Sequence, residues 1–157
     1  MTIIPATPAH AADIAQLIMT AMTEDCGQYL AGKEPTLDEF YPTMLDLVLM
    51  DDSQYSWRNA FVAVDEEATE GNVEYAPVAG AIVGYNGADL HRLRRRFQEE
   101  ALKQLQMDYS QMDDETEAGE FYLDSLAIYP EYRRRGIARQ LLKRATEHAA
   151  SLNLPAA

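Results

Sequence analysis

The stretch "FYLDSLAIYPEYRRRGIARQLLKRATEHAASL", residues 121–152, decides the fold of this chain. Its beginning, Phe121 to Tyr129, is rich in aromatic and aliphatic residues, which is typical of a buried β-strand, and Pro130 ends that strand. Apolar residues then recur at helical spacing, at Ile137, Leu141, Leu142, Ala145, Ala149 and Leu152. The stretch therefore predicts a strand, a short turn and a helix that begins at about Gly136.

The turn before this helix has the composition of an anion site. The first backbone N–H groups of a helix have no partner within the helix and lie at the positive end of its dipole. Gly136 lets a bulky anion approach the backbone, and Ala138 is the next-smallest choice at a second close position. Arg133 and Arg135 add charge that suits a pyrophosphate. Arginines before a helix are usually just solvated, so the flanking strand and helix are what favour the anion site.

The segment "LDSLAIYPEYRRRGIARQLL" resembles the central motif of the GCN5-related N-acetyltransferase (GNAT) superfamily. The acetyl-CoA loop of that family reads Q/R-x-x-G-x-G/A, and Arg133, Gly136 and Ala138 match it. The preceding strand, the proline and the tyrosine match through Leu126, Ile128, Pro130 and Tyr132. The match covers about residues 121–152, and the order of the predicted elements upstream also fits the family.

The resemblance implies a binding site for acetyl-CoA as a co-substrate. Amides from about Arg134 to Arg139 would hold the CoA pyrophosphate, and the backbone of Leu126 to Ile128 would pair with pantetheine like an added strand. A main-chain N–H of Leu126 or Ala127 would polarise the acetyl carbonyl as the tetrahedral intermediate forms. The implied cofactor-binding residues are Leu126, Ala127, Ile128, Arg133, Arg134, Arg135, Gly136, Ile137, Ala138 and Arg139.

Direct acetyl transfer needs a group that takes a proton from the acceptor ammonium, because only the neutral amine attacks. Asp124 lies on the cofactor strand just before Leu126 and is the first candidate base or ammonium anchor, and Glu120 is the second. Tyr122 shares the face of Asp124 by strand alternation, which makes it a candidate for lining the acceptor cleft. Plainer interpretations stand beside these: carboxylates at strand ends are usually solvated or paired with arginine, and the tyrosine can be a packed aromatic.

Looser candidates come from the N-terminal half of the chain. The aromatic residues considered for the acceptor side are Tyr29, Tyr41, Tyr55 and Trp57. Cys26 is interpreted as a passive thiol, since nothing around it in the sequence marks it as activated.

The upstream sequence predicts the rest of an α/β (mixed α+β) domain. Strands are expected in "TIIPA", "AFVAVDEE" and "EYAPVAGAIVGYNG", and a helix that Thr7 caps runs to about Met22. Because Pro42 interrupts "LDEFYPTMLDLVLM", we expect a turn there, followed by a short helix. The whole chain, residues 1–157, is interpreted as one acetyltransferase-like domain with a central mixed sheet flanked by helices.

Residues 87–119 are interpreted as a helical insertion between the third and fourth strands. Its apolar stripe is Leu90, Leu93, Phe97, Ala101 and Leu105. Its arginines are Arg92, Arg94, Arg95 and Arg96, which we interpret as a solvated face balanced by Glu99 and Glu100 rather than as a nucleic-acid site. Our hypothesis is that this insertion borders the acceptor site.

The C-terminal segment "SLNLPAA" lies where a neighbouring parallel strand is expected to begin. We expect the C-terminal strands of the domain to be absent from this sequence. The favoured explanation is that the sequence is a piece of a longer chain, and the alternative is that a partner chain supplies the strands.

The composition favours a cationic acceptor. The chain has 26 acidic and 13 basic residues, a formal net charge of −13, and such a surface repels nucleic-acid phosphates. No apolar run suggests a membrane span, no signal peptide is recognised, and the three histidines have no metal-ligand spacing. A single cysteine suits a reducing cytoplasm.

The sequence therefore predicts a cytoplasmic enzyme that transfers acetyl from acetyl-CoA to a primary amine, without a metal. The acceptor is a small molecule, an amino-acid derivative or a peptide N-terminus. The alternative is a non-catalytic acyl-CoA-binding or regulatory module on the same fold, and a nucleic-acid-binding protein is disfavoured by the charge balance. Dimers are common in the family, so a homodimer is the assembly to test.

Overall fold

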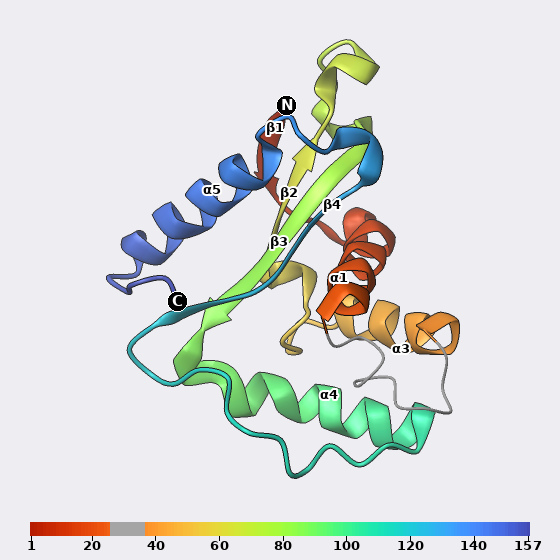
Figure 1. Cartoon of the computed structure of the whole chain (residues 1–157), viewed down its shortest axis with the longest axis vertical. Coiled ribbons are helices and arrows are strands. Elements are labelled where there is room, and N and C mark those ends of the chain that lie inside the picture. The colour runs from red at the N-terminus through yellow and green to blue at the C-terminus, as the bar shows by residue number, and fades with distance from the viewer. Residues whose placement is uncertain (26–36) are drawn as a thin grey trace.

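The structure is a computed structural model that describes residues 1–25 and 37–157. Its centre is an antiparallel sheet in the order β1-β2-β3-β4 (Figure 1). The strands are β1 (Thr2–Pro5), β2 (Ala60–Val64), β3 (Val78–Asn86) and β4 (Phe121–Ile128). The helices are α1 (Ala11–Asp25), α3 (Leu37–Leu49), α4 (Leu90–Leu105) and α5 (Ile137–Ser151). The predicted mixture of sheet and flanking helices is confirmed.

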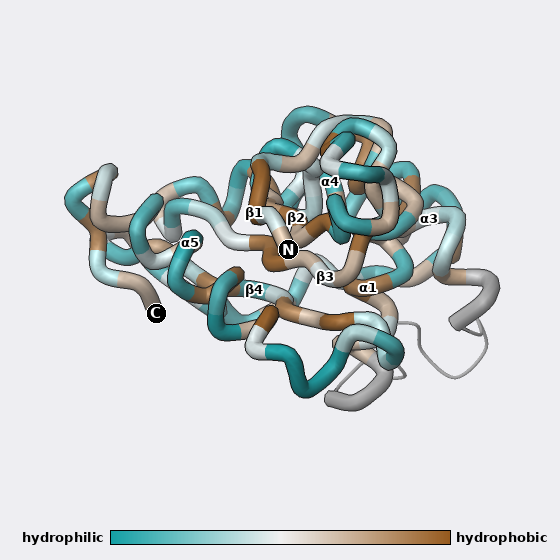
Figure 2. The backbone as a smooth tube through the Cα atoms, turned by 90° about the horizontal axis from the view of Figure 1, so that it is seen from above, coloured by the Kyte–Doolittle hydropathy of each residue, from teal (hydrophilic) through white to brown (hydrophobic). Residues whose placement is uncertain are grey.

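The helices cover the two faces of the sheet unequally. On one face, α1, α3 and α4 bury Ile14, Met44 and Phe97 in a large cluster that includes Val62 and Val83 of the strands. On the other face, only α5 packs among the described residues, and its buried residues Ile137, Leu141 and Ala145 contact Ala63, Ala79 and Ile82. Figure 2 shows hydrophobic segments on the strands and a largely hydrophilic α5, whose apolar side is a single stripe.

Helix α3 differs from the prediction at Pro42. The sequence predicts a turn there, but Pro42 lies inside one continuous helix from Leu37 to Leu49. A proline in a helix removes one backbone hydrogen bond. Burial of Phe40, Met44 and Leu47 on the core side of the same helix offsets that loss.

Helix α4 confirms the predicted apolar stripe and, at Arg92 and Arg95, the solvated arginine face, but Arg94 departs from it. Leu90, Leu93, Phe97 and Ala101 are buried as expected, but Arg94 is buried with them. Arg94 follows Leu90 by four residues and precedes Phe97 by three, so it lies on the same side of the helix. The prediction that it is solvated is wrong, because the chain after α4 folds back over this side and supplies polar partners.

Strand β4 contains a bulge. The register passes from Gly84↔Leu123 to Val83↔Ser125, so Asp124 is the extra residue, without a partner on β3. Before the bulge, the outer edge of β4 is covered by the C-terminal segment, since Phe121 N–H donates to Pro155 O (2.8 Å) and Leu123 N–H to Ala157 O (3.0 Å). The isolated bridge between Phe121 and Ala156 is parallel, whereas every pairing within the four-stranded sheet is antiparallel.

Within residues 1–25 and 37–157, no helix combines the length and the apolar character that crossing a membrane requires.

Candidate active site

A cavity of about 640 Å³ lies where the turn after β4 leads into α5. Its walls are the second half of β4, the turn, the first residues of α5 and one side of α1. The lining residues are Thr20, Ala21, Leu126, Ala127, Ile128, Tyr132, Arg133, Arg134, Gly136, Ile137, Ala138 and Arg139. A hydrogen bond from Tyr129 Oη to Asp13 Oδ1 (2.6 Å) ties the end of β4 to α1 and so fixes two of these walls.

The outer edge of β4 is open toward this cavity after the bulge. Arg133 Nε donates to Ile128 O (3.1 Å), and Tyr129 N–H donates to Ala79 O (2.8 Å), so Ile128 faces outward and Tyr129 faces β3. Backbone groups alternate between the two edges of a strand. Leu126 therefore presents its N–H and C=O to the outer edge, as Ile128 does, whereas Ala127 pairs inward with β3.

The start of α5 provides an anion-binding surface. Gly136 is the N-cap, with φ +76°, and nothing lies within 4 Å of the position that a Cβ would take. The first hydrogen bond of the helix runs from Gln140 N–H to Gly136 O (3.2 Å), so the amides before it point along the axis. Gly136 is thus an open point at which a phosphate can approach the backbone.

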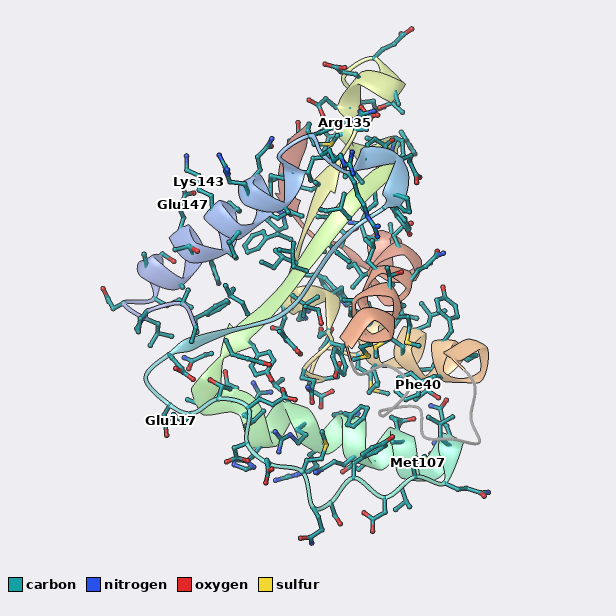
Figure 3. All side chains as sticks on the ribbon, viewed as in Figure 1. Phe40, Met107, Glu117, Arg135, Lys143 and Glu147 are labelled. Atoms are coloured by element: carbon teal, nitrogen blue, oxygen red, sulfur yellow. The ribbon has the colours of Figure 1, made fainter. Side chains whose placement is uncertain are left out.

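Nine of the ten predicted cofactor-binding residues line the cavity, and Arg135 does not. The guanidinium of Arg135 lies over the ring of Tyr132, with Cζ 5.4 Å from the ring centroid. Figure 3 shows Arg135 at the start of α5 and Glu117 at the opposite end of the molecule, so the turn and the loop after α4 flank β4 from its two ends.

Asp124 is a half-buried carboxylate at the bulge of β4. Its Oδ2 atom is buried and has no hydrogen-bond partner among the described residues. Burial and, to a smaller extent, the negative charge of Glu115 raise the pKa of Asp124 to about 7, against a lowering by a hydrogen bond from Gln54 and the charge of Arg94. A carboxyl with a pKa near 7 can accept a proton at neutral pH, so the residue suits a general base.

Known protein families and solved structures resemble this chain in sequence and in fold. The acetyltransferase (GNAT) family pattern matches residues 34–157, most of the chain. The chain belongs to the GNAT acetyltransferase family. No curated protein sequence matches it.

Solved structures share the fold of this GNAT chain. An acetyltransferase crystal structure aligns with a TM-score of 0.74 at 21% identity, over 98% of this chain and 77% of the other. An N-acetyltransferase from Staphylococcus aureus aligns with a TM-score of 0.71 at 23% identity, over 94% of this chain and 76% of the other. A histone acetyltransferase and related acetyltransferase from Corynebacterium glutamicum aligns with a TM-score of 0.61 at 15% identity, over 94% and 71%. Family and fold together support acetyl transfer as the general activity.

The other predicted catalytic residues of the GNAT chain have partners. Glu120 Oε1 accepts a hydrogen bond from Thr116 Oγ1 (2.6 Å), so its carboxylate is engaged by the loop before β4. The ring of Tyr122 packs edge-on against Tyr85 on the same side of the sheet as Asp124, with the centroids 5.6 Å apart. None of Asp124, Glu120 and Tyr122 lines the cavity, and the catalytic roles of all three stay predictions.

The looser candidates lie in different places. Tyr55 is buried against Phe97 in the core, Tyr41 Oη donates to Ala12 O (3.4 Å), and Arg58 stacks on Trp57. Tyr29 and Cys26 are outside the described residues.

Sequence reasoning missed residues that the fold brings to the site. Thr20 and Ala21 come from α1, more than 100 positions before the turn, and nothing in their local sequence marks them. Gln54, Tyr85 and Arg94 surround Asp124 from three other elements. Only Arg94 carried a signal, since it is a charge within the apolar stripe of α4. Across residues 1–25 and 37–157, no three His, Cys, Asp or Glu side chains are grouped to hold a metal ion.

Proposed function

We propose that the chain transfers the acetyl group of acetyl-CoA to a primary amine by direct attack. The observation that carries this proposal is the continuous surface formed by the open edge of β4 and the start of α5, which share one cavity. An extended pantetheine chain can pair with such an edge while its pyrophosphate meets the helix N-terminus. A homodimer and a cytoplasmic location stay predictions from the sequence.

On the cofactor side, the amides at the start of α5 would hold the pyrophosphate, with Arg133, Arg134 and Arg139 as exposed cations around it. Leu126 and Ile128 would exchange backbone hydrogen bonds with the pantetheine. The outward orientation of Leu126 favours its N–H, rather than that of Ala127, as the donor to the acetyl oxygen, where negative charge develops.

On the acceptor side, Asp124 would accept the proton that the amine loses. The nitrogen then forms a bond to the acetyl carbon, the carbon–sulfur bond breaks, and CoA leaves as the thiol after protonation. The Asp124 pKa of about 7 suits this role. A small molecule, an amino-acid derivative and a peptide N-terminus are the acceptors to compare.

The test is thiol release from acetyl-CoA with these three classes of amine, read with a thiol reagent at saturating acetyl-CoA. We expect release that depends on one class and forms the N-acetyl product. Binding of acetyl-CoA without amine-dependent thiol release would contradict the proposal and favour a non-catalytic acyl-CoA-binding module.

A further inference from the structure

A second cavity, of about 240 Å³, lies beside the C-terminal half of α5, on the sheet face that this helix covers. Its walls are α5 and the first residues of β2 and β4, and it shares no lining residue with the larger cavity at the start of α5. Pockets for drug-sized ligands usually have volumes of about 300–1,000 Å³. The second cavity therefore suits a smaller molecule.

The apolar walls of this cavity are aromatic and fixed in place. The ring of His148 packs edge-on against the rings of Phe61 and Phe121, with centroid distances of 5.6 Å to each. The ring of Phe121 lies directly on β3 at Gly84, where an added Cβ would come within 2.8 Å of Phe121 Cε1. Strands β2, β3 and β4 thus present a rigid aromatic surface to the cavity.

The charged wall of the cavity is Arg144. Its guanidinium lies over the ring of Phe61, with Cζ 4.4 Å from the ring centroid. Stacking uses the face of a guanidinium and leaves its N–H donors, which lie in the plane, available to a carboxylate. Among residues 1–25 and 37–157, no carboxylate pairs with Arg144, although its side chain is half-buried. Partial burial of a cation costs free energy that a bound anion can offset.

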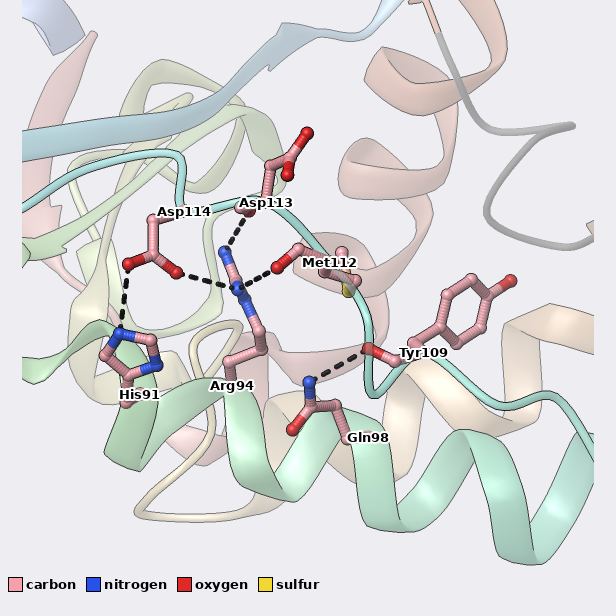
Figure 4. A network of polar contacts seen from close by, with 7 residues as sticks. All are labelled: His91, Arg94, Gln98, Tyr109, Met112, Asp113 and Asp114. Carbon is pink, nitrogen blue, oxygen red and sulfur yellow. Dashed lines mark hydrogen bonds and ion pairs between the residues drawn. The ribbon is translucent and has the colours of Figure 1, made fainter.

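Other arginines of this acidic chain have partners within the chain. Arg94 donates to backbone carbonyls and to Asp114 Oδ1 in the loop after α4 (Figure 4). Arg58, at the rim of the second cavity, donates from Nε to Asp51 Oδ1 (2.9 Å). Arg144 is therefore a cation that faces an aromatic cavity without an acidic side chain of the described residues to neutralise it.

We propose that the second cavity binds a small carboxylic acid with an aromatic body. The carboxylate would accept hydrogen bonds from the guanidinium edge of Arg144, and the body would pack against the rings of Phe121 and His148. A bare anion leaves the aromatic walls without contacts, and a neutral molecule leaves the arginine without an anion, so only this class uses both. The site is separate from acetyl transfer and does not depend on it.

The test is a titration of the full chain with phenylacetate, followed by ¹H–¹⁵N NMR of arginine Nε–H and histidine ring signals. We expect saturable shifts at Arg144 and His148, both with and without saturating acetyl-CoA. Phenylacetamide, the neutral analogue, should bind about tenfold more weakly because it loses the charge-assisted hydrogen bonds. Inorganic phosphate should also bind more weakly than phenylacetate, since it makes no aromatic contacts.

Arg144→Gln should raise the dissociation constant of phenylacetate by about tenfold. The matched control is Lys143→Gln, which removes the same charge from the neighbouring residue. Lys143 lies 4.0 Å from Glu147, on the side of α5 away from the sheet (Figure 3), and does not line the cavity. If Arg144→Gln does not fold, Arg144→Met can still cover the Phe61 ring and gives the same readout.

Equal dissociation constants in the Arg144 and Lys143 variants would overturn the proposal. Displacement of phenylacetate by acetyl-CoA would also overturn it, because the acid would then occupy the larger cavity. Phosphate or phenylacetamide binding as tightly as phenylacetate would refute the ligand class.

Discussion

A side chain at position 136 would enter the cavity at the point where the anion is expected. The backbone of Gly136 has φ +76°, and the space beside its Cα is open. Gly136→Glu would fill that space and place a negative charge before the helix dipole. We expect the affinity for acetyl-CoA, measured by calorimetry, to fall by more than about tenfold, equivalent to about 1.4 kcal/mol.

Gly71→Glu is the matched control for that substitution. Gly71 also has a positive φ, +88°, with nothing within 4 Å of its Cβ position, but it lies outside the cavity. Both variants therefore carry similar backbone strain, about 1–2 kcal/mol, and only one should lose the ligand. Equal affinities in the two variants would refute the assignment of the turn.

Asp124 links activity and stability to pH in opposite directions. Its pKa of about 7 means that the ionised base is lost as the pH falls below that value, so kcat/KM should fall with it. Asp124→Asn should lower kcat by about 10²-fold, with little change in acetyl-CoA affinity. Pre-steady-state rates across the pH range check this, and a variant with wild-type turnover would remove Asp124 as the base.

The sign for stability follows from proton binding. The pKa of the Asp124 carboxyl is higher in the folded chain than the usual value of 3.8, so between about pH 4 and pH 7 the folded state binds more protons than the unfolded state. The free energy of unfolding therefore falls as the pH rises through this window. The side chain of the Asp124→Asn variant cannot ionise, so its free energy of unfolding should not show this fall. In urea titrations, the stability of the variant relative to wild type should therefore be greater at pH 8 than at pH 4. Parallel stability–pH curves would contradict the raised pKa.

At the scale of elements, α4 is part of the core. Phe97 is 1% exposed and contacts Tyr55 and Tyr109, with ring centroids 6.0 and 5.1 Å away, whereas Leu102 on the same helix is 57% exposed. Phe97→Ala should lower the free energy of unfolding by about 3–5 kcal/mol, and Leu102→Ala by less than about 0.5 kcal/mol. Urea unfolding of both variants measures the difference, and similar losses would show that α4 is peripheral.

The sequence predicts an element correctly where neighbouring residues determine its structure, and it fails where contacts with distant segments determine it. The unit of β4, turn and α5 is predictable because its strand pattern, proline, glycine and helix periodicity lie within about 30 consecutive residues. Continuity of α3 through Pro42 and burial of Arg94 depend on which surfaces pack against them, and these come from distant segments. The bulge at Asp124 is likewise set by pairing with β3, so the local sequence around this residue does not determine its inward placement.

At the scale of the whole molecule, the cavity joins elements from both faces of the sheet. Thr20 and Ala21 belong to α1 on one face, and Ile137 to Arg139 belong to α5 on the other. A ligand held between them opposes separation of the layers and binds only the folded chain. At about 100 times its dissociation constant, acetyl-CoA should raise the Tm by about 5–10 °C.

Two other ligands serve as controls for this Tm measurement. All measurements are made at about 150 mM salt, where charges farther apart than a Debye length are largely screened. Adenosine 3′,5′-bisphosphate, which lacks pantetheine and so cannot pair with Leu126 and Ile128, should give a clearly smaller rise at the same concentration. Duplex DNA should give none, because a chain of net charge −13 repels it outside the few arginines at the start of α5. Equal rises with acetyl-CoA and the bisphosphate would contradict strand-like pairing on β4, and a salt-sensitive rise with DNA would revive a nucleic-acid site. If acetyl-CoA binds in the cavity between α1 and α5, the rise in Tm that it causes must exceed the rise caused by either control ligand.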